Sequence, residues 1–399
     1  MPTYPTYKLG DICELLNGFA FKSSNYVQSG LRVIRITNVK KGYVIDEEPQ
    51  FYPLETQEEL KKYILKKGDL LISLTGNVGR VGILREDLLP AALNQRVGCL
   101  RVKDKSLVSL QYLFHLLNTN SFEKDCINSS KGIAQKNMST EWLKEYEINL
   151  PPLPTQQAIV ARIEALFAEL DKAAEHLRTA QQQLKTYRQA VLNHWLNNDE
   201  GKWETVKLGE VADVNTGSTP KRGNKEYWEN GTIPWITSGE TNNQYITKAT
   251  EFITTKAVAE TNCKIIAKGS LVIAMYGEGK TRGKCAELSI DATTNQALAS
   301  ITFTDSRMYK NFAKWFFEKN YEDMRMLSSG GVQPNLNLGI IKNMILPLPP
   351  LTDQHRIVQE IESRLSQAEA AEASIAEALQ KTEALRQSIL KKAFSGELV

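Results

Sequence analysis

Two long stretches of the chain place mostly hydrophobic residues at alternating spacings of four and three positions. The first stretch does so at Ile159, Ile163, Leu166, Leu170, Ala173, Leu177, Ala180, Leu184, Tyr187 and Val191. The second does so at Ile357, Ile361, Arg364, Ala368, Ala371, Ile375, Ala378, Thr382, Leu385 and Ile389, each 198 positions later. This spacing is the a/d pattern of a coiled coil, so both stretches are predicted to be long helices.

The two predicted helices have equal lengths, but the residues at their a and d positions, which form the contact seam of a coiled coil, differ in size and hydrophobicity. The second seam is rich in alanine and includes Arg364 and Thr382, so it is too weak to dimerise on its own. Antiparallel pairing with the first helix inside the chain would let these small residues approach closely, in a rod about 50 Å long at ~1.5 Å per residue. A generic spacer or a homodimer seam is the alternative that the pattern leaves open.

The segment that precedes each helix is duplicated as well. Five short motifs recur in the same order at offsets between 198 and 201. They are Tyr7-Lys8-Leu9-Gly10-Asp11 with Val206-Lys207-Leu208-Gly209-Glu210, Ile34-Arg35-Ile36-Thr37 with Pro234-Trp235-Ile236-Thr237, Lys67-Gly68-Asp69-Leu70 with Lys268-Gly269-Ser270-Leu271, Asn94-Gln95 with Asn295-Gln296, and Leu150-Pro151-Pro152-Leu153 with Leu348-Pro349-Pro350-Leu351. So long a period excludes a solenoid and indicates that one domain was duplicated together with its helix.

Each copy begins with a mixed α/β head. Short β-rich runs such as Leu31 to Ile36 alternate with Gly, Asn, Thr and Ser, and one stretch per copy is helical in pattern, at Ser109 to Leu117 and at Tyr309 to Phe317. This pattern predicts an α+β chain with about five to eight strands per head. We therefore divide the chain into a first head at 1–154, a first long helix at 155–200, a second head at 201–351 and a second long helix at 352–399.

Composition places the chain among ordinary globular proteins, since 42% of its 399 residues are hydrophobic and 24% are charged. No apolar run is long enough to span a membrane, and the first residues do not resemble a signal peptide. The five cysteines form no CxxC pair and the four histidines form no HExxH pair, which argues against a disulfide framework and a zinc site. We expect a cytoplasmic protein.

Charge separates the heads from the helices. The two helical segments together carry a net charge of −3, whereas the heads hold 38 basic and 32 acidic residues, a net charge of +6. A polyanion would therefore bind to the heads rather than to the helices.

A glycine-rich loop at Gly277-Glu278-Gly279-Lys280-Thr281-Arg282-Gly283-Lys284 superficially resembles a phosphate-binding P-loop. Its spacing is one residue too long, and Cys285 stands where a P-loop needs Ser or Thr for magnesium. The sequence favours a strand-to-strand loop that offers its cations to DNA phosphates or guanine edges, as Arg80 would in the first head. A plain hairpin with solvated cations is the open alternative.

Other repeated loops carry residue types suited to DNA. Asn and Gln amides can bond adenine, and Arg can bond guanine. Paired amides more often tie down a turn, and this is the role we expect for Asn94 and Asn295. The candidate DNA contacts are Lys22, Arg35, Asn77, Arg80, Gln95, Arg96, Lys131, Lys136, Lys221, Arg222, Lys280, Arg282, Lys284, Gln296 and Gln333.

The sequence offers no convincing catalytic constellation. An adenine methyltransferase needs a dinucleotide-type glycine turn and an Asn/Asp-Pro-Pro-aromatic loop, but the proline pairs here are flanked by leucine. No carboxylate cluster recurs in both heads as a nuclease metal site would. We expect no catalytic residue, no metal and no cofactor on this chain.

Taken together, these features resemble the specificity subunit of type I restriction-modification enzymes. The resemblance is carried by the two Leu-Pro-Pro-Leu helix entries, by the following Gln157-Ala158-Ile159-Val160 and His355-Arg356-Ile357-Val358, and by the ending from Ser388 to Val399. It covers essentially the whole chain. It implies that each head is a target recognition domain for one half of a split site in double-stranded DNA. It also implies that the paired helices space the heads and bind two modification subunits.

The resemblance further implies which partners perform the chemistry. The modification subunits would carry S-adenosylmethionine and methylate adenine, and restriction subunits would join them to translocate and cleave DNA. A stand-alone methyltransferase or nuclease with an unrecognised active site is the alternative. A coiled-coil adaptor that binds only protein is a weaker one.

The matched helices give a testable expectation for the spacing of the two half-sites. Inserting one heptad into each helix, after Ala180 and after Ala378, should preserve the seam and lengthen the rod by about 10 Å, or roughly 3 base pairs. The methylated motif of this double variant, mapped across a genome, should gain that much spacer. Insertion in one helix alone leaves its partner unmatched and should impair folding. A double variant that folds and methylates DNA with the original spacer contradicts the expectation.

Overall fold

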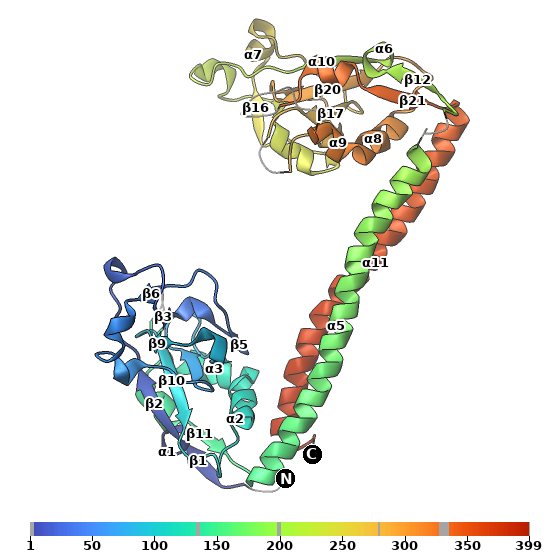
Figure 1. Ribbon diagram of the computed structural model, residues 1–399. Helices are drawn as coiled ribbons and strands as arrows, with labels where there is room; N and C mark the ends of the chain where they lie inside the picture. The colour runs from blue at the N-terminus through green and yellow to red at the C-terminus, as the bar shows by residue number, and fades with distance from the viewer. Residues whose placement is uncertain (1–3, 133–135, 198–200, 278–279, 327–334, 399) are drawn as a thin grey trace. The chain divides into compact units, whose positions relative to one another are not determined.

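The computed structural model describes residues 4–132, 136–197, 201–277, 280–326 and 335–398 (Figure 1). Contacts divide the chain into two compact units. Unit 1 contains Met1–Arg178 and Ala376–Val399, and unit 2 contains Thr179–Ile375. Each unit therefore holds one head together with one part of each long helix. None of the described helices combines the length and the hydrophobicity needed to cross a membrane.

The first head is built on a sheet of four antiparallel strands, in the order β2 (Cys13–Asn17), β10 (Val97–Val102), β7 (Leu70–Ser73) and β8 (Val81–Ile83). Leu70, Leu71 and Ile72 of the inner strand β7 are all fully buried because both faces of the sheet are covered. Leu70 and Ile72 pack with the helices α2 (Leu110–Leu117) and α3 (Asn120–Ser129) on one face. Leu71 packs on the other face, toward the second sheet. That second sheet and the smaller elements are β6 (Phe51–Tyr52), β3 (Leu31–Ile34), β9 (Ala91–Leu93), β1 (Thr6–Lys8), α1 (Leu9–Ile12), β4 (Val39–Lys40), β5 (Tyr43–Val44), α4 (Thr140–Glu145) and β11 (Glu147–Asn149).

The second head repeats this plan. Its inner strand β17 (Leu271–Ala274) is again fully buried and faces helices on one side and a second sheet on the other. The main sheet runs β13 (Ala212–Thr216), β20 (Leu298–Phe303), β17, β18 (Cys285–Leu288) and β15 (Tyr245–Ile246). The other elements are β12 (Glu204–Lys207), α6 (Leu208–Val211), β14 (Ile233–Ile236), β16 (Glu251–Ile253), α7 (Thr255–Glu260), β19 (Thr293–Thr294), α8 (Lys310–Lys319), α9 (Tyr321–Met326), α10 (Leu338–Lys342) and β21 (Ile345–Leu348).

The structure confirms the duplication but corrects its register at one strand. Ile34 lies opposite Leu93, and Ile236 lies opposite Thr294, in equivalent parallel pairs. Ile34 therefore corresponds to Ile236, and the sequence alignment of Ile34 to Thr37 with Pro234 to Thr237 is wrong by two residues. A shift of two keeps every side chain on the same face of a strand, so the hydrophobic pattern cannot detect it.

The predicted helical stretches are confirmed, whereas the predicted number of strands is wrong. The stretch at Ser109 to Leu117 is α2, with the Ser109 hydroxyl capping its first turn, and the stretch at Tyr309 to Phe317 lies in α8. The expected five to eight strands per head are too few. The described residues of the first head form eleven strands, β1 to β11, because several have only two or three residues and show no periodicity in the sequence.

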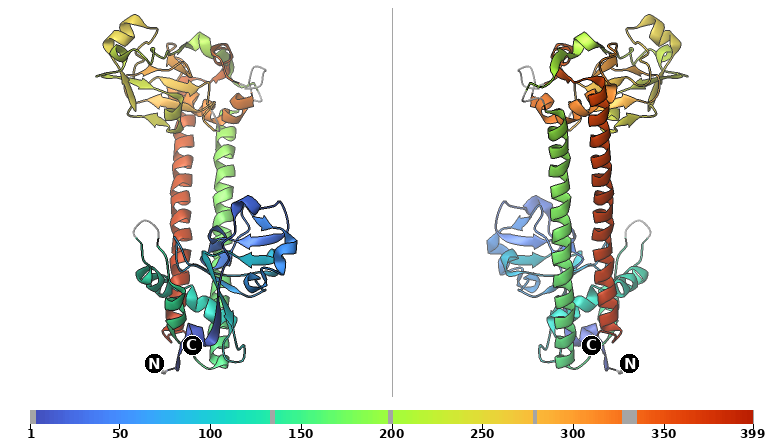
Figure 2. Two further views of the ribbon diagram at one scale, coloured as in Figure 1. Left: turned by 90° about the vertical axis from the view of Figure 1, so that its left-hand side faces the viewer. Right: turned by 90° about the vertical axis from the view of Figure 1, so that its right-hand side faces the viewer.

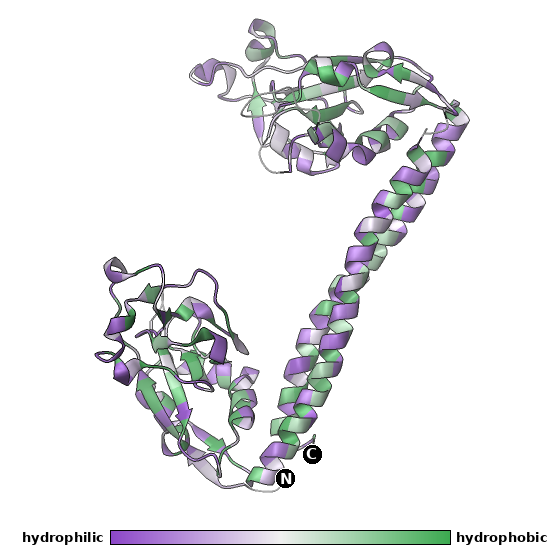
Figure 3. Cartoon of the chain, in the orientation of Figure 1, coloured by the Kyte–Doolittle hydropathy of each residue, from purple (hydrophilic) through white to green (hydrophobic). Residues whose placement is uncertain are grey.

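The two long helices are α5 (Leu153–Leu196) and α11 (Leu351–Phe394), each of 44 residues. Figure 3 shows hydrophobic and polar residues alternating along both of them. Sixteen of the twenty predicted seam positions are confirmed, since residues such as Ile163, Leu177 and Ile361 are buried or partly covered. At the other four positions the predicted residues Ala173, Tyr187, Arg364 and Leu385 are exposed, and the residue after each is covered instead: Ala174, Arg188, Leu365 and Arg386.

The seam shift has a simple geometric origin. Two hydrophobic positions of a heptad can be separated by four residues and then three, or by three and then four. These two patterns share one position per heptad and differ by one residue at the second position, so the shared residues alone cannot tell which pattern the helix uses. In the structure Leu365 replaces Arg364 in the second seam and is 3% exposed. The second helix is therefore better suited to pairing than its predicted seam indicates.

Within each unit the two long helices run antiparallel and are joined by an equivalent ion pair. In unit 1, where the start of α5 lies beside the end of α11 (Figure 2), Arg386 of α11 pairs with Asp171 of α5. In unit 2, Arg188 of α5 lies 3.5 Å from Glu369 of α11. Both residues of one pair are 198 positions from their counterparts in the other. Ion pairs of such exposure contribute about 0–1 kcal/mol, so they specify register more than they add stability.

A fully buried glutamine ties the start of α5 to the first head. Gln156 accepts a hydrogen bond from the Ser109 N–H at 2.8 Å. Its amide donates to the carbonyls of Leu107 and Pro151 at 2.9 and 2.8 Å. The side chain has no exposed surface, so these partners satisfy polar groups that water cannot reach.

Gln354 does the same at the start of α11 in the second head. It accepts from the Tyr309 N–H at 2.7 Å and donates to the carbonyls of Arg307 and Pro349 at 2.7 and 2.8 Å. Neither glutamine was predicted from the sequence. The signal was present, because Pro-Pro-Leu-x-x-Gln recurs at an offset of 198.

The other long helix contributes a second glutamine to each head. Gln387 of α11 donates to the Asn118 carbonyl at 3.3 Å and accepts from the Asn120 N–H at 3.0 Å in the first head. Gln189 of α5 donates to the Lys319 carbonyl at 3.3 Å in the second. Each head is therefore bound to both long helices through side-chain amides that meet its backbone.

Replacing Gln156 with leucine should destabilise the first head, because it leaves the Ser109 N–H and two carbonyls buried without partners. Each unsatisfied group costs about 1–3 kcal/mol, so we expect a loss of at least about 2 kcal/mol in the free energy of unfolding, measured by urea denaturation. Amide exchange at Ser109 should become faster. The neighbouring Gln157→Leu is the control, because Gln157 is exposed. Equal stability of the two variants would contradict this role.

Candidate nucleic-acid interface

Three segments of the first head meet beyond the end of strand β7. The Leu74 N–H donates to the Arg96 carbonyl at 3.0 Å, and the Met138 N–H donates to the Leu74 carbonyl at 2.8 Å. The Gly76 N–H donates to the Lys136 carbonyl at 2.8 Å. The β7–β8 loop, the turn after β9 and the segment before α4 are thereby fixed to one another by backbone hydrogen bonds.

Ser73 fixes the shape of the β7–β8 loop from inside. Its buried hydroxyl accepts from the Arg80 N–H at 3.0 Å and donates to the Asn77 carbonyl at 2.5 Å. The Gly79 N–H donates to the Ser73 carbonyl at 3.0 Å. Asn77 and Arg80 are therefore presented by a loop whose backbone is held on both sides.

A cleft of about 240 Å³ brings three of the predicted DNA contacts together: Asn77, Arg80 and Arg96. Lys40 adds a third cation to its lining, and Thr37 and Ser73 add hydroxyls. Lys40 and Thr37 are not among the predicted contacts, because they follow strand β3 and reach the cleft only through the fold. Three cations and no carboxylate line this cleft, so its electrostatic potential is positive.

The turn that carries Arg96 is built as the sequence predicts. The Asn94 side chain accepts from the Arg96 N–H at 3.2 Å, and the Asn295 side chain accepts from the Ala297 N–H at 3.0 Å. The structural role expected for both asparagines is confirmed.

The second head has the same framework with different side chains. The Met275 N–H donates to the Ala297 carbonyl at 2.8 Å, so Ala297 occupies the position of Arg96. The Ala274 N–H donates to the Lys284 carbonyl at 3.0 Å, as the Ser73 N–H does to that of Arg80, so Lys284 occupies the position of Arg80. The Lys284 ammonium donates to the Asn242 side chain at 2.9 Å.

The glycine-rich loop of the second head joins two antiparallel strands, β17 and β18. A P-loop leads from a strand into a helix, so the predicted strand-to-strand loop is confirmed and the P-loop resemblance is superficial. Glu278 and Gly279 lie outside the described residues. At the far side of the loop, the Tyr321 hydroxyl donates to the Lys280 carbonyl at 2.5 Å, and Arg282 donates to the Arg325 carbonyl at 3.4 Å.

The other predicted contacts lie in separate surroundings and stay predictions. Arg222 pairs with Glu251, which raises the pKa of its guanidinium, and stacks over Trp228 with its central carbon 4.0 Å from the ring centre. Arg35 donates to the Glu48 carbonyl at 2.8 Å. The side chain of Gln296 accepts from the Thr219 hydroxyl. The exposed ones are Lys22, Gln95, Lys131, Lys136 and Lys221, and Gln333 lies outside the described residues.

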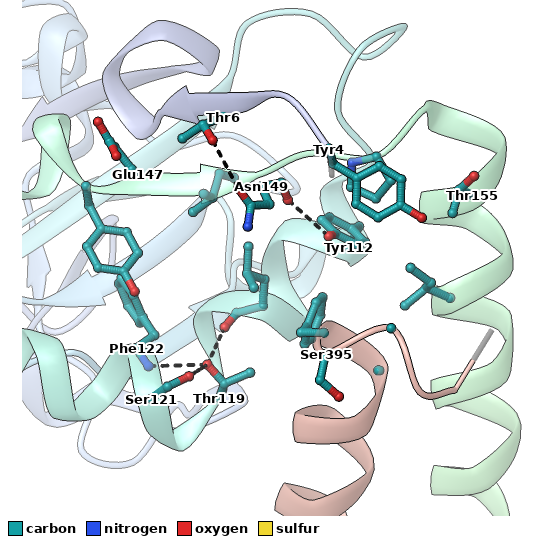
Figure 4. A pocket seen from close by; sticks show the side chains of 18 residues that line it. Tyr4, Thr6, Tyr112, Thr119, Ser121, Phe122, Glu147, Asn149, Thr155 and Ser395 are labelled. Carbon is teal, nitrogen blue, oxygen red and sulfur yellow. Dashed lines mark hydrogen bonds between the residues drawn. The ribbon is translucent and has the colours of Figure 1, made fainter. Parts of the chain in front are cut away.

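A larger cavity, of about 720 Å³, lies at the base of the first head beside the end of α11 (Figure 4). The Thr6 hydroxyl donates to the Asn149 side chain at 3.1 Å, and the Tyr112 hydroxyl donates to the Asn149 carbonyl at 3.3 Å. Its described lining contains Glu147 and no Lys or Arg, so it does not suit a polyanion.

Burial holds two cysteines and one histidine of the first head in their neutral forms. Burial raises the pKa of the Cys13 and Cys126 thiols to about 12. Burial lowers the pKa of His115 to about 4, so this imidazole is neutral near pH 7. Within the described residues no three His, Cys, Asp or Glu side chains cluster closely enough to hold a metal. These groups therefore provide neither a thiolate nucleophile nor a metal site.

Two glycines let an adjacent segment approach the turn in each head. A Cβ built on Gly18 would lie 2.2 Å from the Asn94 carbonyl oxygen, and one on Gly217 would lie 1.8 Å from that of Thr294. Beside them, Phe19 and Ser218 donate their N–H groups to the same strand end, at 2.8 and 2.9 Å. Only glycine permits this packing.

The fold and its loops define a duplicated scaffold of two heads on paired helices. The family model for the type I restriction modification DNA specificity domain matches residues 1–177 and 200–380. The chain therefore belongs to this family.

Relatives of known function match almost the whole chain. The type I restriction enzyme EcoBI specificity subunit of Escherichia coli is 26% identical over 421 residues, covering 98% of this chain and 85% of that protein. The StySPI specificity subunit of Salmonella potsdam is 24% identical over 420 residues, covering 99% and 89%.

Solved structures share the fold. A chain from a type I R-M system studied for its complex assembly and conformational transition has a TM-score of 0.75 at 19% identity, covering 100% of this chain and 99% of that chain. The HsdS subunit from Thermoanaerobacter tengcongensis has a TM-score of 0.61 at 19% identity, covering 100% and 98%.

Replacing Gly18 with alanine should displace the Asn94 turn and weaken DNA binding by the first head. Forcing a methyl group against backbone costs about 1–3 kcal/mol, which should appear as a lower unfolding midpoint in urea. Gly223→Ala is the matched control, because a Cβ there meets nothing within 4 Å. If Gly18→Ala is as stable as Gly223→Ala and binds DNA normally, the close approach has no consequence.

Proposed function

We propose that this chain is the DNA-recognition subunit of a type I restriction-modification complex, and that each head reads one half of a split site in double-stranded DNA. The observation that carries the proposal is the shared loop framework at the end of β7 and of β17. In both heads three segments are fixed by equivalent backbone hydrogen bonds, because the Leu336 N–H donates to the Met275 carbonyl at 3.1 Å as the Met138 N–H does to that of Leu74. The side chains that these segments present differ. Such an arrangement suits two DNA-binding heads that share one fold and recognise different half-sites.

Electrostatics supports binding of DNA by the heads. The heads carry a net charge of +6 and the helical segments −3. The exposed lysines, such as Lys22, Lys131 and Lys221, suit phosphate contacts, which give affinity without sequence preference.

The long helices are the proposed docking surface for two modification subunits. Tyr187 and Leu385 are 39% and 50% exposed and occupy equivalent positions 198 residues apart. We choose these two positions because large apolar side chains are enriched at the centre of protein interfaces. Their equivalence offers one such surface in each unit, which suits two copies of the same partner. Restriction subunits would join this assembly in the cytoplasm.

The chemistry is proposed to belong to the partners. S-adenosylmethionine would bind to the modification subunits, which methylate adenine, and this chain would supply only the choice of DNA sequence. The buried thiols and the absence of a metal-binding cluster among the described residues fit a subunit without a catalytic residue.

The purified chain alone should transfer no methyl group and hydrolyse neither DNA nor nucleotide. Adding a modification subunit and S-adenosylmethionine should produce adenine methylation at one split sequence, detected by sequencing modified bases in cells with and without this chain. Robust turnover by the isolated, contaminant-free chain would instead support a stand-alone enzyme. Salt-insensitive or absent binding to duplex DNA would support a protein-only adaptor.

A further inference from the structure

We propose that the cleft between Arg80 and Arg96 binds the edge of a guanine in the half-site read by the first head. This proposal rests on the proposed function and assigns a chemical target to one part of the recognition surface.

The cleft holds cations without counter-charges. Lys40, Arg80 and Arg96 line it, and none of their side chains makes an ion pair or a side-chain hydrogen bond with the described residues. Most arginines of this chain are engaged, as Arg101 is with Asp69 at 2.7 Å. Leaving several cations together and unpaired is unfavourable in the isolated protein, so the cleft is suited to a ligand that supplies acceptor atoms.

The two arginines are placed by backbone, not by their own side chains. The N–H and C=O of Arg80 bond to Ser73, at 3.0 Å in both cases. The N–H of Arg96 bonds to Asn94 and its C=O accepts from Leu74, at 3.2 and 3.0 Å. Both guanidinium groups therefore extend from fixed points, which lowers the entropy lost when they bind.

A guanine edge fits this arrangement better than a phosphate. The major-groove edge of guanine presents the acceptors N7 and O6, which a guanidinium can engage with two parallel hydrogen bonds. The cleft is recessed and bounded by Ile36 and Val39, and it adds the neutral Asn77 and Thr37 beside the cations. Phosphates lie on the outside of the duplex, where the exposed lysines of this head can meet them.

The second head cannot repeat this contact. Ala297 occupies the position of Arg96 and ends at Cβ, and Lys284 occupies that of Arg80 and is bonded to Asn242 at 2.9 Å. A lysine is a point charge without the planar fork. The guanine preference should therefore belong to the first head alone.

The test uses the complete complex with its modification subunit and S-adenosylmethionine, and it reads the methylated motif across a genome. Arg96→Ala and Arg80→Ala should each relax one guanine in the half-site of the first head, by roughly 5- to 150-fold in relative methylation of the mismatched site. The other half-site should keep its preference. Arg96→Lys should also lose the guanine preference, because charge alone does not select the base.

Two controls separate the readings of this experiment. Arg85→Ala removes an exposed arginine that pairs with Asp87 outside the cleft, and it should leave the motif unchanged. Ala297→Arg changes the equivalent position in the second head, and it should leave the half-site of the first head unchanged.

Two outcomes would overturn the inference while leaving the proposed function intact. One is a uniform loss of methylation with an unchanged motif in Arg96→Ala and Arg80→Ala, which would assign both residues to phosphates. Another is full guanine preference in Arg96→Lys with folding confirmed by circular dichroism. If the wild-type complex methylates no split sequence at all, the proposed function itself fails.

Discussion

The arrangement of each head on its helix depends on one buried side-chain amide. Gln156 and Gln354 each join the first turn of a long helix to two carbonyls and one N–H of the adjacent head, with no access to water. A glutamine is the residue that can accept one bond and donate two at this place. The loop framework beyond β7 and β17 belongs to heads that are attached in this way. The position of the proposed DNA-contacting side chains relative to the helix therefore depends on this attachment.

The contacts of the long helices are repeated in the two units, whereas the side chains of the candidate DNA-binding loops differ between the two heads. The ion pairs Arg386–Asp171 and Arg188–Glu369 repeat at an offset of 198, as do the glutamines Gln387 and Gln189. These contacts belong to the helices and to the surfaces that hold the heads. The recognition loops keep only the backbone bonds and change the side chains. Selection on such a scaffold can alter one target half without disturbing the attachment of either head.

The sequence predicts the architecture well and the details of contact poorly. Periodicity and repeated motifs correctly predict the duplication, the two long helices, the strand-to-strand loop and the role of Asn94 in its turn. The predicted seam is wrong at four of its twenty positions, since a heptad accepts Ala173 and Ala174 equally well and only the partner helix selects between them. Lys40 and Thr37 enter the cleft from a segment that shares no motif with Arg80. Only the tertiary fold brings these residues together with Arg80, and local sequence patterns do not predict that proximity.

The central claim is that equivalent loops in the two heads touch separate halves of one DNA site. Hydrogen–deuterium exchange of the complete complex, with duplexes in which one half-site at a time is randomised, tests it most directly. We predict that the full site protects 74–77 and 94–96 in the first head and 275–277 and 295–297 in the second. Randomising one half should remove protection from one head only. Protection that is lost from both heads together, or that never falls on these loops, would contradict the account.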